Sequence, residues 1–142
     1  MKKAIGFALF LVALMLTACS DPTAADLLLG SWKMERAYET VTSATQGTVV
    51  NDLPSTDVRY IRFDEDGSCL IKEGNEKYHY YWYLSDETEL LLVPTNSTTI
   101  QLNYTISELD KERLVYGNYY TQLDSASGAR TIYTYTFEYK KL

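Results

Sequence analysis

The sequence has few of the side chains that form metal or nucleophilic sites. It contains one histidine, His79, and two cysteines, Cys19 and Cys69, in 142 residues. A zinc site needs about three or four ligands from His, Cys and carboxylates, and two cysteines do not make a disulfide framework. A Ser-His-Asp or Cys-His device would have to use His79, which lies in a strand-like aromatic run without a nucleophile motif. We therefore expect no metal, no cofactor and no enzymatic activity, although carboxylates are plentiful enough to leave an acid–base pair open.

Basic charge is also scarce. The chain has 13 Lys and Arg against 19 Asp and Glu, a net charge of −6, and loss of Lys2 and Lys3 with a leader would take it to −8. Nucleic-acid binding requires Lys and Arg on the phosphates, and no basic cluster is present. This composition excludes a nucleic-acid partner and electrostatic docking on anionic lipid.

Long apolar runs are absent after the first twenty residues. Residues 4–16 are almost wholly apolar and follow Lys2 and Lys3. This run is too short for a membrane-spanning helix, which needs about 20 residues, and a positive start before a short apolar core is typical of a signal peptide. One reading is an ordinary secretory signal cleaved near Ala18, with Cys19 a structural cysteine.

The other reading depends on Leu16-Thr17-Ala18-Cys19, which resembles the lipobox of bacterial lipoproteins. The resemblance implies that Cys19 is acylated and becomes the mature N-terminus, and more than one acyl chain gives stable anchoring. Ser20 follows in place of the Asp that favours inner-membrane retention, so we expect the cell envelope, at the outer membrane of a Gram-negative bacterium. The expected organisation is a signal peptide (1–18), a tether (19–26) and one barrel domain (27–142).

The mature chain favours strands. Its 13 tyrosines, with Thr, Val and Ile, are β-formers, and helix-forming runs are scarce apart from a turn over 24–28 that Thr23 can cap. We expect eight strands, at 31–40, 58–63, 68–73, 77–84, 89–93, 98–107, 113–120 and 131–140. Short turns force antiparallel neighbours, so the predicted fold is all-β: an eight-stranded antiparallel up-and-down barrel with a short N-terminal helical turn.

Several local patterns leave two readings. Residues 64–68 predict a tight hairpin turn with Gly67 at positive φ; the same stretch partly matches a calcium loop, but Arg62 takes the first ligand position. Cys69 is expected to be a small buried hydrophobe. Arg36 does not fit the alternation, because it is a charged residue on the mostly apolar face of the first strand.

Two long polar stretches, 39–57 and 121–130, are expected to be the first and seventh loops, with a short extra strand at Thr48-Val49-Val50. Odd-numbered loops of an up-and-down barrel lie at one end. One end of the barrel is therefore expected to be elaborated and open, as in a ligand-binding cup, and the other end plain.

Gly30-Ser31-Trp32 resembles the Gly-x-Trp motif of lipocalins, and the patterns at 60–68, 104–107 and 135–141 are similar to those of bacterial lipocalin-like lipoproteins. The resemblance implies a lipocalin-like barrel with Gly30 and Trp32 at its closed base. It also implies a basic residue from late in the chain over Trp32, for which Arg130 is the nearest candidate.

The tyrosines are the feature that points to function. An aromatic cavity buries apolar ligands and leaves hydroxyl groups to orient them, so we expect a monomer that binds a small apolar or amphipathic molecule. The alternative is that aromatic side chains fill the barrel, which would make the protein a ligandless module that binds another envelope protein. The candidate ligand contacts are the inward set Tyr104, Tyr133, Tyr135 and Phe137, with Tyr119 and Tyr120 near the mouth.

The lipobox makes a direct prediction. Cells that express the chain should incorporate a palmitate analogue into it, and Cys19→Ala should abolish that labelling because the acylated sulfur is lost. Unchanged labelling of the variant would contradict the anchor.

Overall fold

The computed structural model describes residues 21–54, 59–97 and 99–142; the predicted signal peptide and Cys19 lie outside these ranges. The capped helical turn is confirmed as α2 (Ala24–Leu28), with Thr23 in a capping box with Asp26. No helix in the described ranges is long and apolar enough to cross a membrane. The strands are β1 (Gly30–Ser43), β2 (Gly47–Asp52), β3 (Arg59–Phe63), β4 (Ser68–Glu73), β5 (Glu76–Ser85), β6 (Glu89–Pro94), β7 (Leu102–Leu109), β8 (Arg113–Leu123) and β9 (Arg130–Lys141).

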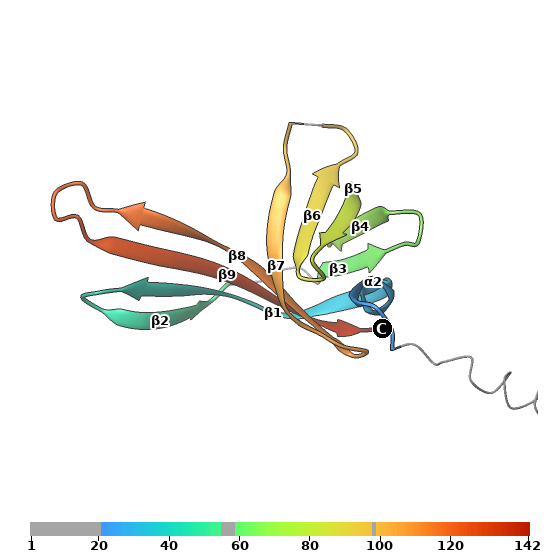
Figure 1. Ribbon diagram of the computed structural model, residues 1–142, viewed down its shortest axis with the longest axis horizontal. Helices are drawn as coiled ribbons and strands as arrows, with labels where there is room; N and C mark the ends of the chain where they lie inside the picture. Colours follow the sequence, from blue (N-terminus) through green and yellow to red (C-terminus); the bar gives the residue numbers. More distant parts are fainter. Residues whose placement is uncertain (1–20, 55–58, 98) are drawn as a thin grey trace, which may run out of the picture.

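The predicted eight-stranded, antiparallel, up-and-down barrel is confirmed (Figure 1). Its strands follow the order β1-β3-β4-β5-β6-β7-β8-β9, and pairing of β1 with β9 closes the ring. The ninth strand, β2, lies outside the ring and pairs with the second half of β1. The predicted extra strand at residues 48–50 is therefore confirmed.

A four-stranded sheet extends from the barrel in the order β2-β1-β9-β8 (Figure 1). We call this sheet, residues 38–52 and 118–135, the arm. The expectation of long loops at 39–57 and 121–130 is wrong for much of their length, because β1 continues to Ser43 and β8 to Leu123. Their hairpin ends do lie at the same end of the molecule, as loop parity predicts (Figure 1).

A β-bulge explains why the charged Arg36 falls on the predicted apolar face of the first strand. The pairing of β1 with β9 shifts register between Met34 and Arg36, so Ala37 becomes the buried residue. Arg36 faces outward, where its Nη2 lies 2.8 Å from Asp52 Oδ1. One extra residue in a strand thus changes which side chains face inward.

The β3–β4 connection is the predicted hairpin turn. Gly67 has φ 83°, the Asp64 N–H donates to the Ser68 carbonyl at 2.9 Å, and the Ser68 N–H donates to Asp66 Oδ1 at 2.9 Å. The Asp66 carboxylate thus accepts a backbone N–H within the turn, as expected of a hairpin rather than of a calcium-binding loop.

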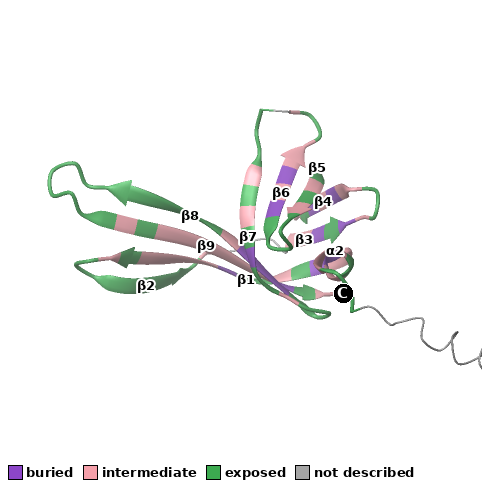
Figure 2. Ribbon diagram, viewed as in Figure 1, coloured by how far each residue is buried: buried purple, intermediate pink, exposed green. Residues whose placement is uncertain are grey.

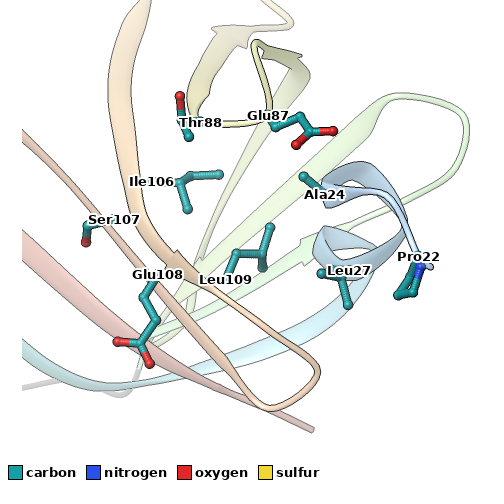
Figure 3. A pocket seen from close by; sticks show the side chains of 9 residues that line it. All are labelled: Pro22, Ala24, Leu27, Glu87, Thr88, Ile106, Ser107, Glu108 and Leu109. Atoms are coloured by element: carbon teal, nitrogen blue, oxygen red, sulfur yellow. The ribbon is translucent and has the colours of Figure 1, made fainter.

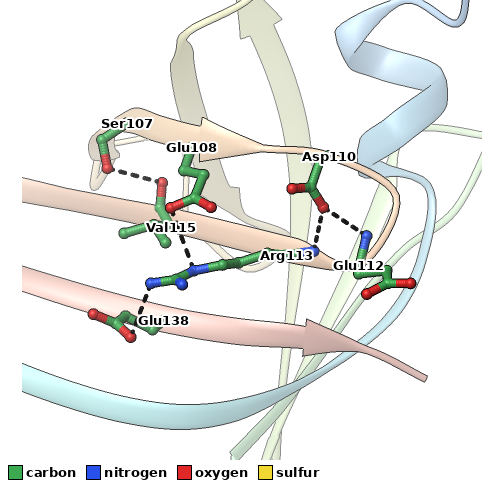
Figure 4. Close-up of polar contacts among 7 residues, drawn as sticks. All are labelled: Ser107, Glu108, Asp110, Glu112, Arg113, Val115 and Glu138. Carbon is green, nitrogen blue, oxygen red and sulfur yellow. Dashed lines mark hydrogen bonds and ion pairs between the residues drawn. The ribbon is translucent and has the colours of Figure 1, made fainter.

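Polar contacts join β8 to its two neighbours, β7 and β9 (Figure 4). Arg113 forms ion pairs with Glu108 and Glu138, each at 3.3 Å, and Asp110 accepts the N–H groups of Glu112 and Arg113 in the turn. All three ion-pairing side chains reach solvent, so these contacts fix register more than they add stability.

Burial concentrates in the barrel, and most of the arm is exposed (Figure 2). The core includes Trp32, Phe63, Leu92 and Tyr139. The prediction that Cys69 is buried is confirmed, and burial raises the pKa of its thiol to about 12. The folded structure is therefore held by the barrel, which carries the arm.

We predict that Gly117→Ala destabilises the protein by about 1–3 kcal/mol. Gly117 lies where β8 leaves β7, and a Cβ atom there would sit 2.2 Å from the backbone oxygen of Tyr135. Strand β9 would have to shift to relieve the clash. Denaturant unfolding measures the loss, and an unchanged free energy of unfolding would contradict the close approach of β8 and β9 at Gly117.

Candidate ligand site at the barrel mouth

Trp32 lies at the end of the barrel next to α2. Its ring is fully buried, and its Nε1–H donates to the Leu28 carbonyl at 2.8 Å. Lys141 Nζ lies 4.3 Å from the centre of the ring and donates to the carbonyls of Leu27 and Leu29. This end is closed, and its polar groups satisfy one another.

The prediction that Arg130 covers Trp32 is wrong. Arg130 pairs with Leu123 at the start of β9 in the arm, whereas Lys141 ends the same strand beside Trp32. Gly30 fits this base for a local reason: it has φ 108°, and a Cβ atom there would lie 3.2 Å from Lys141 Cε.

A hollow of about 320 Å³ lies beside the closed end, between α2, β7 and the β5–β6 turn (Figure 3). Ala24 and Leu27 face Ile106 and Leu109 across it, with Glu87 at its margin. None of the predicted ligand residues lines it, and it lies apart from the barrel mouth.

The opposite end of the barrel holds a pocket of about 250 Å³. Apolar side chains form most of its wall, and Arg59 and Glu73 supply a polar pair, with Nη2 and Oε2 3.1 Å apart. Arg59 begins β3 and Glu73 ends β4, so their hairpin register places them face to face. The pocket is lined by Met34, Ala37, Leu53, Pro54, Arg59, Glu73 and Phe137.

Arg59 is the electrostatic centre of this mouth. Burial alone would lower its pKa, but the nearby Tyr139, Tyr116 and Glu73 outweigh burial, so the pKa of the guanidinium is raised and it stays charged. Its Nε–H is buried and has no hydrogen-bond partner among the described residues. The guanidinium also lies over the ring of Phe137, 5.8 Å from its centre.

Beneath the pocket, aromatic rings pack against one another. Tyr116 and Tyr139 stack at 5.4 Å, and the Tyr116 hydroxyl donates to the Tyr139 hydroxyl at 3.1 Å. Tyr104 meets Tyr116 edge-on at 4.8 Å and Phe137 at 6.2 Å. A ligand therefore has room at the mouth, where Phe137 lines the pocket, and not between the packed rings of Tyr104, Tyr116 and Tyr139.

The structure divides the six predicted ligand residues into separate groups. Tyr104 and Phe137 belong to the barrel interior. The rings of Tyr120, Tyr133 and Tyr135 form a stack on the arm, with Tyr120 4.7 Å from Tyr133 and 6.1 Å from Tyr135.

Tyr119 is on the other face of the arm and is 72% exposed. Because β8 and β9 run beyond the barrel, their outer residues keep the alternation of barrel strands without entering the barrel. The stacked tyrosines are thus on the arm face that continues the barrel interior. On this face the pKa of Tyr135 is raised, mainly by a hydrogen bond with Glu39 and to a smaller extent by a hydrogen bond with Tyr120.

Sequence reasoning missed Arg59, Glu73, Met34 and Ala37. The tight turn at residues 64–68 carried a usable signal, because it fixes a register in which positions 59 and 73 face each other and Arg59 shares a face with Ile61. Ala37 carried no such signal, since it faces inward only because of the bulge.

The fold defines the class of protein: a closed, antiparallel, all-β barrel with lipocalin-like architecture. The chain matches no protein-family model and no curated protein. Membership of the bacterial lipocalin-like lipoproteins therefore stays a prediction from the motifs.

The buried phenols predict a loss of stability at alkaline pH. Burial raises the pKa of Tyr116 and of Tyr139, whereas an unfolded tyrosine titrates near pH 10. Their contribution is complete below that pH and is lost as pH rises, because only the unfolded chain then releases these protons. Each phenol adds a slope of up to about 1.4 kcal/mol per pH unit.

Denaturant titrations between about pH 9 and pH 11 measure this slope. Tyr116→Phe should flatten it, while Tyr119→Phe, at an exposed site, should leave it unchanged. An equal slope in both variants would contradict the assignment.

Proposed function

We propose that this protein is a lipid-anchored lipoprotein of the cell envelope, at the outer membrane, that binds a small amphipathic molecule at the mouth of its barrel. The anchor is the acylated Cys19. The observation that carries the binding role is the mouth pocket, in which the Arg59–Glu73 pair lies among apolar walls.

The composition of this pocket favours an amphipathic ligand. Ligand sites combine mainly apolar linings with a few polar groups that fix orientation. Arg59 lines the pocket with a charged guanidinium, whose Nε–H is buried without a partner among the described residues, and it suits a polar or anionic head group. Phe137 and Met34 offer apolar contact. About 250 Å³ is slightly below the usual range of about 300–1,000 Å³, so the pocket suits a small molecule or one end of a longer one.

The arm gives a longer ligand somewhere to continue. Val41 and Tyr133 are cross-strand partners on β1 and β9, and Tyr120 stacks on Tyr133. An apolar tail could lie along this face while its head stays at Arg59. Phe137, with Tyr104 packed against it, would then lie near the head, and the tail would contact Tyr120, Tyr133 and Tyr135. Tyr119 would make no contact, because it is on the other face of the arm.

A second candidate function is supported by the packed interior. Tyr104, Tyr116 and Tyr139 fill the barrel with aromatic contacts, as expected of a ligandless module that binds another envelope protein through its exposed arm. A substitution that fills the pocket discriminates between the two functions, because it would abolish ligand binding and leave the arm intact.

We predict that the full chain, purified in detergent from its own host, carries a small molecule detectable by native mass spectrometry. Fatty acids, sterols or porphyrins should also raise its melting temperature. Ala37→Leu should abolish both the co-purification and the thermal shift, because it fills the mouth pocket. Ala24→Leu should preserve them, because Ala24 lies beside the closed end. Absence of a co-purifying molecule together with no thermal shift would favour the ligandless module.

A further inference from the structure

The outer part of β8 forms one edge of the arm. Strand β7 pairs with β8 from Leu114 to Gly117, and β9 pairs with β8 up to Leu123 on the other side. Residues 118–123 therefore have a strand on one side only within the described parts of the chain. The backbone groups on their other side are available to a further strand.

Hydrogen bonds near both ends of β8 show which backbone groups these are. The N–H of Asp124 donates across to Ala129, so even-numbered residues of β8 turn toward β9. The carbonyl of Val115 instead accepts from Ser107 on the β7 side. Because the direction alternates along an antiparallel strand, the N–H and C=O groups of Tyr119, Thr121 and Leu123 point to the open edge.

This edge lacks the protection that edge strands usually carry. Residues 114–123 contain no charge, in a chain whose net charge is −6, and Tyr119 and Leu123 are 72% and 61% exposed. Proteins commonly protect edges with charges or proline. The other edge of the arm, β2, has such features, since Asp52 pairs with Arg36 and Pro54 follows.

We propose that the β8 edge binds the β8 edge of a second copy of this chain, antiparallel, with a two-fold axis at Thr121. Thr121 then faces Thr121 of the second copy, and Tyr119 faces Leu123 of the second copy. This register pairs every open backbone group of the three residues and covers both exposed apolar side chains. Centring the axis at Tyr119 would instead place Gly117, which β7 already pairs, in the contact.

The absence of charge supports a second copy as the occupant. Two acidic molecules repel each other, and the uncharged β8 edge lets them approach without placing like charges opposite one another. The two arms would form one continuous sheet, β2-β1-β9-β8 in each copy. A single strand pair buries less than the about 1,200–2,000 Å² of a stable interface, so we expect a weak, concentration-dependent dimer in place of the monomer predicted from the sequence.

Cross-linking tests the axis. In the full chain, solubilised in detergent, Thr121→Cys should form a disulfide-linked dimer on mild oxidation, because paired Cα atoms of hydrogen-bonded antiparallel strands are about 5.5 Å apart. Val50→Cys, at the middle of the β2 edge, is the matched control, and the unsubstituted chain accounts for Cys19 and Cys69. Equal cross-linking at positions 50 and 121, or none at 121, would overturn the proposal.

Sedimentation equilibrium tests the register without a new cysteine. The unsubstituted chain should show a monomer–dimer equilibrium that Thr121→Lys weakens about tenfold or more, because two lysines would face each other, while Val50→Lys leaves it unchanged. Tyr119→Lys should also weaken it, and adding Leu123→Glu should restore it by placing opposite charges across the axis. A monomer at every concentration, or no rescue by the double variant, would show the proposal to be wrong.

Discussion

The pairing of β1 with β9 is the interaction on which the rest of the molecule depends. It extends from Trp32 beside Lys141 to Ser43 beside Thr131. Its first part closes the barrel and brings the end of the chain to the base, and its second part forms the centre of the arm. A single continuous ladder therefore sets both the closed volume and the exposed sheet.

The two halves of this ladder differ in what stabilises them. In the barrel, β1 contributes Trp32 to a buried cluster that includes Ile61 and Leu92. In the arm, Val49 and Val50 of β2 remain 43% and 52% exposed. Backbone hydrogen bonds and partial packing therefore contribute a larger share of the stability there. Local opening is expected first where buried apolar contact is lowest. A second copy on β8, or a ligand tail on the arm, would stabilise the less protected half.

The strands, hairpins and helical cap could be predicted from the sequence because their signals are local. Thr23 and Asp26 form the cap within one turn, and Gly67 marks its hairpin. The arm was missed because its Thr- and Ser-rich segment reads as polar loop, although Thr40 and Thr42 lie in β1 and are good strand formers.

The site residues were harder to predict because they depend on register over long distances. The bulge at Met34 decides that Ala37 and not Arg36 faces the pocket. The full length of β9 likewise decides that Lys141 and not Arg130 reaches Trp32. A one-residue change of register exchanges the two faces of a strand, so motif spacing alone could not assign either role.

The two ends of the barrel differ in how well their polar groups are satisfied, and this difference supports the ligand site that we propose at the mouth. At the base, the Trp32 indole N–H and the Lys141 ammonium each bind backbone carbonyls, so that end is satisfied without a ligand. At the mouth, the Arg59 guanidinium has one carboxylate partner, Glu73, and a buried Nε–H without a partner among the described residues. Leaving a buried donor unpaired costs about 1–3 kcal/mol, and a ligand oxygen at that position would recover part of this cost. Trp32 therefore closes the base, and Arg59 is the residue around which we place the proposed ligand.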